Sequence, residues 1–206
     1  MKKILLVVVI IIFITLLLPL AIVWLIGGSG EGQSPIESGT VSVYVSEEDC
    51  VKDMDINEYL KCVVAAEMPA DFEEEALKAQ SVAARTYLYS HIAEKDKGNI
   101  AERHNGAVIC TDSTHCQAYI SEDKRRESWG AGADENWNKI STAVDETTGQ
   151  IMTYNDEIIS AVFHSTSSGM TESAFDVWGA DVPYLQSVAS TGDKESPKYH
   201  IEFPLS

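Results

Sequence analysis

The sequence predicts an α+β protein, in which one extracytoplasmic domain at residues 40–206 combines a pair of helices with a mixed or antiparallel sheet. Helical and strand patterns are segregated along the chain rather than alternating, which is typical of this class. The roughly 165 residues of this region are enough for a single sizeable core. An uncharged apolar run at the N-terminus stands apart from the domain.

That apolar run, residues 4–26, predicts a transmembrane anchor. As a helix it would be ~34 Å long, enough to cross a bilayer. A cleavable signal peptide is the alternative, but its apolar region would be about 7–15 residues long and would end at a small-residue cleavage site. The two lysines of residues 1–3 make this tip cytoplasmic by the positive-inside rule, since no basic residue follows before Lys52. Residues 27–39 have the composition of a flexible linker.

The first half of the domain predicts a strand followed by two helices. Residues 41–45 alternate apolar and polar side chains, as a half-buried strand does. A helix capped by Asp55 or Asn57 runs to about residue 68, where Pro69 forces the chain to turn. A longer helix begins near residues 72–75, where acidic side chains complement its positive end, and continues to residues 95–97.

The second half predicts less regular structure. Residues 99–118 are irregular, and a third helix covers residues 134–147. Residues 150–154 and 157–163 flank an Asn-Asp pair and predict a β-hairpin. Residues 184–189 predict a last strand.

Glu67 is the carboxylate that the pattern singles out. It ends an otherwise apolar helical run that includes Val63 and Val64. An apolar surrounding disfavours the ionised form of a carboxyl group, which is how a glutamate can serve as a general acid near neutral pH. A surface glutamate at a helix end is the alternative that periodicity alone favours. The acidic residues at 71–75 resemble a solvated helix start.

The stretch EYLKCVVAAEMPADF followed by EALKAQSVAARTY, within residues 58–87, resembles the signature of the stage II sporulation protein D family, which is related to the amidase-enhancer proteins of bacterial cell walls. The resemblance extends over about residues 41–188. It implies a lytic transglycosylase in which Glu67 is the catalytic acid. Such an enzyme cuts the bond between N-acetylmuramic acid and N-acetylglucosamine without water and leaves a 1,6-anhydro end.

The resemblance also implies residues that contact the glycan. Arg85, in SVAARTY, is a candidate for binding sugar oxygens through its planar donor fork, and an ion pair with a neighbouring carboxylate is the alternative. Ser165 and Ser167 lie in a loop similar to the family's HSTSGG loop, and Tyr184 lies in PYLQSV. Two departures stand out: Ser168 replaces a glycine of that loop, and Gln186 replaces a basic residue.

Four potential metal ligands, His104, Cys110, His115 and Cys116, lie within thirteen residues. Two imidazoles and two thiolates form a set that tetrahedral zinc takes, with no open position for water, so a bound zinc would be structural. The segment DSTHCQAY also matches the family's HCQxY segment, where some members bind zinc. A Cys110–Cys116 disulfide is the alternative outside the cytoplasm.

Cys50 and Cys62 could form another disulfide, but a buried free thiol at Cys62 is at least as consistent with its apolar helix.

Charge and family resemblance together suggest the partners. A formal net charge of −17 argues against nucleic acid as a ligand. The resemblance implies peptide-stripped peptidoglycan strands as substrate, an engulfment amidase and a multi-spanning membrane protein as partners, and a location in the mother-cell membrane during sporulation. Family members continue well past Ser206, so the chain is expected to be truncated at its C-terminus. A non-enzymatic scaffold that stimulates an amidase is the second interpretation.

Overall fold

The computed structural model describes residues 39–99 and 101–196, which belong to the second of the two units into which the chain divides. The predicted cytoplasmic tip, the anchor at residues 4–26 and nearly all of the linker lie outside them. Among the residues described, none of the helices is both long enough and apolar enough to cross a membrane.

A small mixed sheet has strand β1 (Thr40–Val45) at its centre. Strand β2 (Cys50–Asp55) pairs with it antiparallel, and the short strand β3 (Ile109–Cys110) pairs with it parallel on the other side. Val41, Val43 and Val45 of β1 are buried, so the alternation predicted for this strand is confirmed. The mixed sheet and its helices also confirm the predicted α+β class.

Helix α3 (Ile56–Glu67) forms where the sequence predicts it. The carboxylate of Asp55 caps its start by accepting hydrogen bonds from the backbone N–H groups of Asn57, at 2.9 Å, and Glu58, at 3.1 Å. Met68 has an extended backbone (φ −131°, ψ 132°), as a residue before proline prefers. The helix therefore ends at Glu67.

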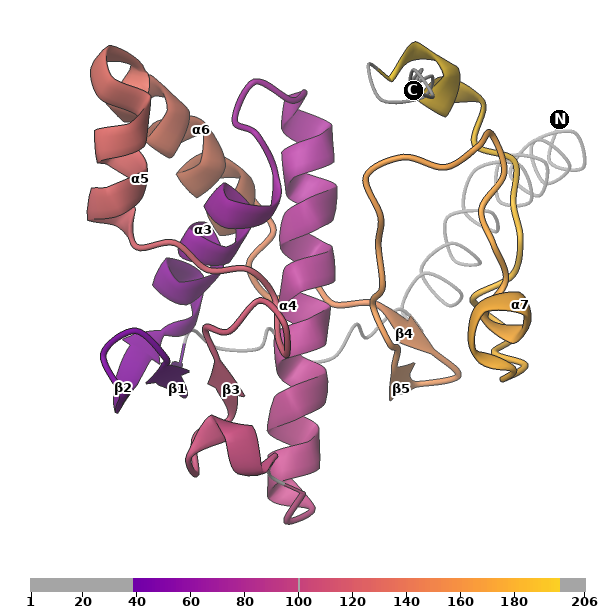
Figure 1. The fold of residues 1–206 in the computed structure, drawn as a ribbon, viewed down its shortest axis with the longest axis horizontal. Helices are drawn as coiled ribbons and strands as arrows, with labels where there is room; N and C mark the ends of the chain where they lie inside the picture. Colours follow the sequence, from indigo (N-terminus) through magenta and orange to yellow (C-terminus); the bar gives the residue numbers. More distant parts are fainter. Residues whose placement is uncertain (1–38, 100, 197–206) are drawn as a thin grey trace, which may run out of the picture. The chain divides into compact units, whose positions relative to one another are not determined.

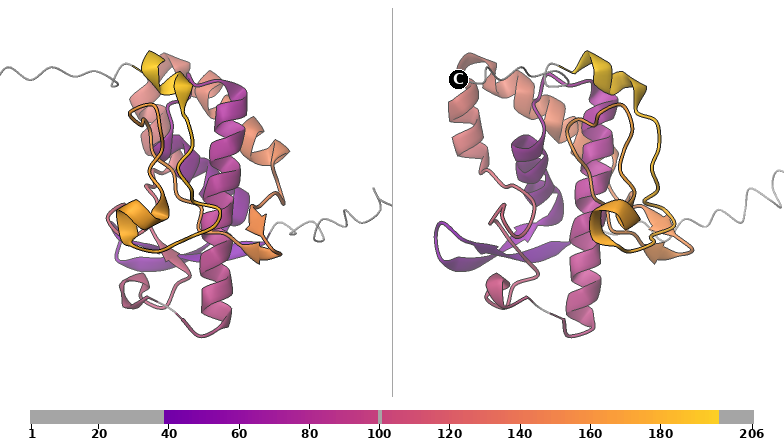
Figure 2. Two further views of the ribbon diagram at one scale, coloured as in Figure 1. Left: turned by 90° about the vertical axis from the view of Figure 1, so that its right-hand side faces the viewer. Right: turned by 45° about the vertical axis from the view of Figure 1, so that its right-hand side comes forward.

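Two further long helices complete the core. Helix α4 (Glu74–Asp96) and helix α6 (Ala133–Glu146) both pack against α3, and helix α5 (Glu122–Trp129) packs on α6. Leu60, Val64, Leu77, Leu88 and Ile140, from three of these helices, are fully buried. Figure 1 shows α4 with α3 on one side and the chain from β4 onward on the other, and the right-hand view of Figure 2 shows the same order.

The remaining elements are short. Strands β4 (Thr153–Tyr154) and β5 (Glu157–Ile158) form the predicted hairpin. Its two turn residues have φ of 50° and 65°, the left-handed values that a type I′ turn requires. Helix α7 (Ala174–Trp178) follows. Short 3₁₀ turns occupy Glu102–His104, Gly130–Gly132 and Thr191–Glu195.

The predicted last strand at residues 184–189 is wrong. The backbone of this segment makes a single isolated bridge, between Ala189 and Met170, and Leu185 instead donates from its N–H group to the carbonyl of Val182 in a turn. The carbonyls of Val188 and Leu185 also accept from the N–H groups of Thr171 and Ala174, but these bonds do not extend the bridge into a ladder.

Candidate active site and metal centre

Glu67 lies half-buried at the end of α3. Its Oε1 atom accepts a hydrogen bond of 2.7 Å from the backbone N–H of Ala118. Within residues 39–99 and 101–196 its Oε2 atom has no hydrogen-bond partner. The carboxyl group is thus held at one oxygen.

The segment that contacts Glu67 runs along α3. The ring of Tyr119 stacks on that of Tyr59, with centroids 5.8 Å apart and planes 17° apart. The backbone N–H of Ile120 donates to the carbonyl of Cys62 at 3.4 Å. This segment begins directly after the predicted metal ligands His115 and Cys116.

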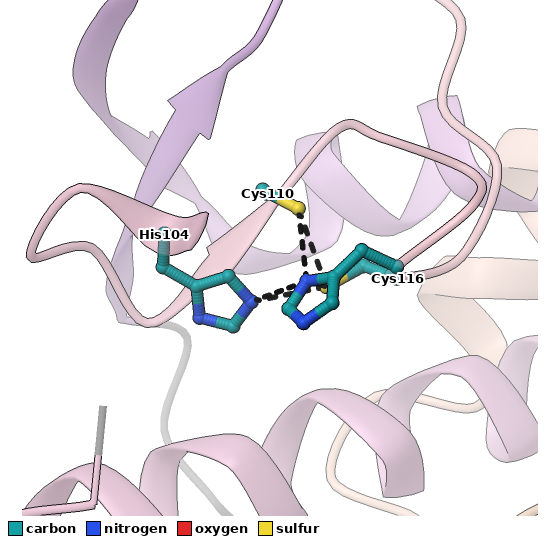
Figure 3. A group of neighbouring side chains, drawn as sticks. His104, Cys110 and Cys116 are labelled. Atoms are coloured by element: carbon teal, nitrogen blue, oxygen red, sulfur yellow. Dashed lines mark hydrogen bonds between the residues drawn. The ribbon is translucent and has the colours of Figure 1, made fainter. Parts of the chain in front are cut away.

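The four predicted metal ligands do lie together. Their ligand atoms are all within 4.8 Å of one another, and Figure 3 shows His104, Cys110 and Cys116 pointing toward one another. His104 Nε2 is 3.2 Å from both His115 Nδ1 and Cys116 Sγ, and Cys110 Sγ is 3.5 Å from both His115 Nδ1 and Cys116 Sγ. Ligand atoms about 2.0–2.3 Å from a tetrahedral zinc would be roughly 3.3–3.8 Å apart. The donor set and its geometry fit a tetrahedral metal ion.

Burial acts differently on the imidazole and thiol ligands of the cluster. Burial, followed by the neighbouring His115, lowers the pKa of His104, which favours the neutral imidazole that binds metals. Burial raises the pKa of the Cys116 thiol and, with Cys116 nearby, that of the Tyr87 hydroxyl. A cation would supply the charge that stabilises a buried thiolate.

The disulfide alternative at this cluster is not what the structure contains. Cys110 and Cys116 are both free thiols, as are Cys50 and Cys62. Cys62 is buried in α3, and burial raises the pKa of its thiol to about 11. The buried free thiol predicted as one possibility at Cys62 is therefore the arrangement that the structure has.

A cavity of about 490 Å³ opens beside the cluster. His104 and His115 line it together with His91 and Glu94 of α4. His91 Nδ1 is 2.9 Å from the backbone carbonyl of Tyr87, and Glu94 pairs with Lys97 at 2.8 Å. His91 and Glu94 thus already have partners within α4 or just beyond its end. The cavity is therefore an opening onto the four-ligand cluster.

Arg85 is fully buried, with an exposed fraction of 1%. Its guanidinium group donates to the backbone carbonyls of Thr147 at 2.6 Å and Val144 at 2.9 Å. These are carbonyls at the C-terminal end of α6, where a helix leaves its acceptors unpaired and favours a cation. The alternative ion pair with a carboxylate does not occur in the described part of the chain. The contacts described give Arg85 a role in packing.

The other predicted glycan-binding residues lie in the chain after β5. Ser165 is exposed, whereas Ser167 donates to the carboxylate of Asp193 from its backbone N–H, at 2.8 Å, and from its hydroxyl group. Tyr184 accepts a hydrogen bond from the N–H of Ser160 at 3.1 Å and lines a cavity of about 420 Å³ with His164. That cavity is formed by residues 162–188 alone, so it does not bring these residues together with Glu67.

The backbone N–H of Ala118 is the contact that side-chain patterns did not identify. Every residue except proline has a backbone N–H, so the residue type at position 118 does not predict this contact. One indirect indication was present in the sequence, since Ala118 lies within the HCQAY segment that carries two of the metal ligands.

Fold and site together define an α+β protein with one helix-end candidate acid beside a candidate tetrahedral metal centre. A family model described as stage II sporulation protein matches residues 44–154, more than half of the chain. The chain belongs to the stage II sporulation protein D family.

Three relatives illustrate the similarity. Stage II sporulation protein D of Bacillus amyloliquefaciens is 40% identical over 167 residues, which are 81% of this chain and 46% of that protein. The protein of the same name from Bacillus subtilis strain 168 is 39% identical over 173 residues, 83% of this chain and 49% of its own length. A protein named Amidase enhancer from the same strain is 36% identical over 136 residues, 66% of this chain and 16% of that protein. The chain thus spans about half the length of the sporulation proteins that it matches.

Proposed function

We propose that this chain is a membrane-anchored lytic transglycosylase that cuts peptide-stripped peptidoglycan strands during engulfment in sporulation, with Glu67 as its acid and base. The observation that carries the proposal is the geometry of Glu67, whose Oε1 is held by Ala118 and whose Oε2 has no partner in the described residues. Membership of the sporulation family supports the setting.

One carboxyl group suffices for this reaction. Glu67 donates its proton to the glycosidic oxygen as the bond to N-acetylmuramic acid breaks. The resulting carboxylate then takes the proton of that sugar's 6-hydroxyl group, whose oxygen closes the 1,6-anhydro ring. A hydrolase would need a second carboxylate to act as nucleophile or to activate water. The nearby acidic residues Glu74 and Glu75 are exposed and pair with Lys78, which supports Glu67 over these two as the proposed acid.

Zinc is the proposed occupant of the cluster, held by His104, Cys110, His115 and Cys116. It would supply structural stability, since four protein ligands leave no position for a reacting water. The proposed partners are an engulfment amidase and a multi-spanning membrane protein, with the domain outside the mother-cell membrane. The proposed anchor is residues 4–26.

The test is to incubate the 206-residue protein with peptide-stripped glycan strands and to measure 1,6-anhydro ends by mass spectrometry. We expect such ends with the native protein and none with Glu67→Gln. Glu73→Gln is the matched control, because Glu73 is an exposed carboxylate six residues away, and it should retain activity. Anhydro ends that persist in Glu67→Gln would refute the role of Glu67.

A second candidate function, favoured by the similarity to the protein named Amidase enhancer, is stimulation of a cell-wall amidase without catalysis. In that case no anhydro ends should form. The native protein and Glu67→Gln should then raise amidase activity equally.

A further inference from the structure

One short piece of chain joins the metal-ligand cluster to Glu67. Cys116 belongs to the cluster, and two residues later the N–H of Ala118 contacts the carboxyl group of Glu67. Residues 116–120 are called the positioning segment below. No carboxylate or other side chain shares this contact at Oε1 in the described residues.

The positioning segment is fixed at its two ends. At its C-terminal end Tyr119 stacks on Tyr59, and Ile120 bonds to the backbone of α3. At its N-terminal end Cys116 is buried among the other three ligands. Gln117 between them is also buried, but in the described structure neither polar atom of its side-chain amide has a hydrogen-bond partner.

The cluster is one of two attachments of the N-terminal end of the segment. The other is the turn before His115, where the carbonyl of Asp112 accepts from the N–H of Cys116 at 2.8 Å and Thr111 donates from its N–H to the carbonyl of Tyr44 in β1 at 3.0 Å. The cluster adds the contact with His104, which lies outside this turn.

We propose that the cluster positions Glu67 through Ala118: with its four ligands held together, the positioning segment presents the Ala118 N–H to Oε1, and this fixes the direction of Oε2. Ala118 is thus a positioning residue that acts through its backbone. The proposal rests on the proposed role of Glu67 as the acid, and it adds a route by which occupancy of the cluster controls that acid.

The Ala118 N–H contributes by orienting the carboxyl group of Glu67. A glutamate at a helix end has rotatable side-chain bonds, and a proton donor must lie within hydrogen-bond reach of the oxygen that it protonates. A main-chain donor at 2.7 Å removes much of this freedom before the substrate binds. Loss of the donor should reduce turnover while substrate binding stays the same, because Ala118 itself contacts Glu67 and not the sugar.

The link can be observed without measuring activity. The step Gln117–Ala118 is the sole Gln-Ala pair in the sequence, so ¹³C-carbonyl glutamine combined with ¹⁵N-alanine gives one NMR signal, that of the Ala118 amide. We expect this signal to move upfield in Glu67→Ala, which removes the acceptor. Stripping the 206-residue protein with a chelator should move the signal in the same direction, and adding Zn²⁺ alone should restore it.

A signal that stays in place on removal of Zn²⁺, in a protein whose circular dichroism is unchanged, would overturn the proposal. So would a signal that does not respond to Glu67→Ala. Where metal removal unfolds the chain, the test is made on the Zn²⁺-loaded protein, with Ala118 replaced by lactic acid. This substitution turns the amide into an ester, which removes the N–H, keeps the methyl side chain and weakens the Gln117 carbonyl as an acceptor.

The ester at position 118 should retain one Zn²⁺ and lower kcat for anhydro-sugar formation by about tenfold or more, with KM unchanged. The matched control replaces Ile120 by the α-hydroxy acid that carries the isoleucine side chain. It removes one hydrogen bond of the same segment, to Cys62 rather than to Glu67, and should leave kcat within about twofold. Equal kcat values for the two esters would overturn the proposal.

The assay of anhydro ends tests the proposed function, and the NMR signal of Ala118 tests the positioning of Glu67. If native protein forms no anhydro ends, the proposed function fails, whereas the NMR signal still reports whether the cluster holds Ala118 against Glu67. If activity is present and the signal ignores both Zn²⁺ and Glu67→Ala, the proposed function stands and the inference fails.

Discussion

Replacement of Arg85 by methionine tests whether this side chain packs the core or binds the substrate. Methionine retains most of the apolar stem and removes the guanidinium group. The structure then loses the donor of two buried main-chain bonds, to Thr147 at 2.6 Å and to Val144 at 2.9 Å, and of longer side-chain bonds to Thr147 and Asn57.

The expected cost follows from the hydrogen bonds that are lost. Each carbonyl keeps one other donor, the N–H of Gln150 at 3.0 Å for Thr147 and the hydroxyl of Thr147 at 3.1 Å for Val144. The loss is therefore that of two hydrogen bonds from a charged group, about 1.5–3 kcal/mol each. Removing a buried cation offsets part of this, since burial already lowers the pKa of Arg85, which shows that the charged form is disfavoured there. We expect a net loss of about 3 kcal/mol in the free energy of unfolding. For a domain of this size that corresponds to a melting temperature about 6–12 °C lower.

Urea unfolding followed by circular dichroism measures the change. Lys78→Met is the matched control, because Lys78 is another cation of α4 that contacts the end of α6, through Glu146 at 2.7 Å, but its partners Glu74 and Glu146 are more than half exposed. Such surface pairs contribute at most about 1 kcal/mol. An Arg85→Met protein as stable as Lys78→Met, yet unable to bind glycan strands, would refute the packing role and support the predicted sugar contact.

Two further predictions concern the cysteines. Cys116→Ser should lower the zinc content from one ion per chain to none, whereas Cys50→Ser, outside the cluster, should leave it at one. The zinc content is measured with a colorimetric chelator after denaturation. Equal zinc content in both variants would contradict the metal site. For Cys62 the folded pKa of about 11 lies above its ordinary value of 9.0, so its contribution to stability is complete below pH 9 and is lost as the pH rises toward 11. Urea unfolding between pH 8 and 11 should show a loss on the order of 2 kcal/mol that is absent from Cys62→Ala; identical slopes would exclude a buried neutral thiol.

The elements that the sequence predicted are those specified by local chemistry. Asp55 and Pro69 mark the two ends of α3 by capping and by steric exclusion, and both effects act within a few residues. The alternating valines of β1 and the turn at Asn155 are similarly local. These signals do not depend on the rest of the fold.

Among the elements that escaped prediction, α5 and β2 lack a buried face. Helix α5 has no fully buried residue; its Trp129 is partly buried against the core, and Arg126 pairs with Asp134 at 2.7 Å on the surface. Strand β2 is an edge strand that alternates little, since most of its six residues are exposed. Both therefore lack the apolar period from which a helix or strand is read.

The candidate site shows the same division between local and tertiary information. The motif HxxxxxCxxxxHC indicated a metal centre because the types and the number of the ligands are visible in the sequence. The position of that centre relative to Glu67 was not visible, since it depends on β3 pairing with β1 and on Tyr119 lying against Tyr59. The resulting contact between residues 67 and 118 uses a backbone N–H, which every residue except proline possesses. A side-chain pattern can therefore nominate the acid and the metal ligands separately, whereas only the fold can connect them, and the ester substitution at Ala118 addresses that connection directly.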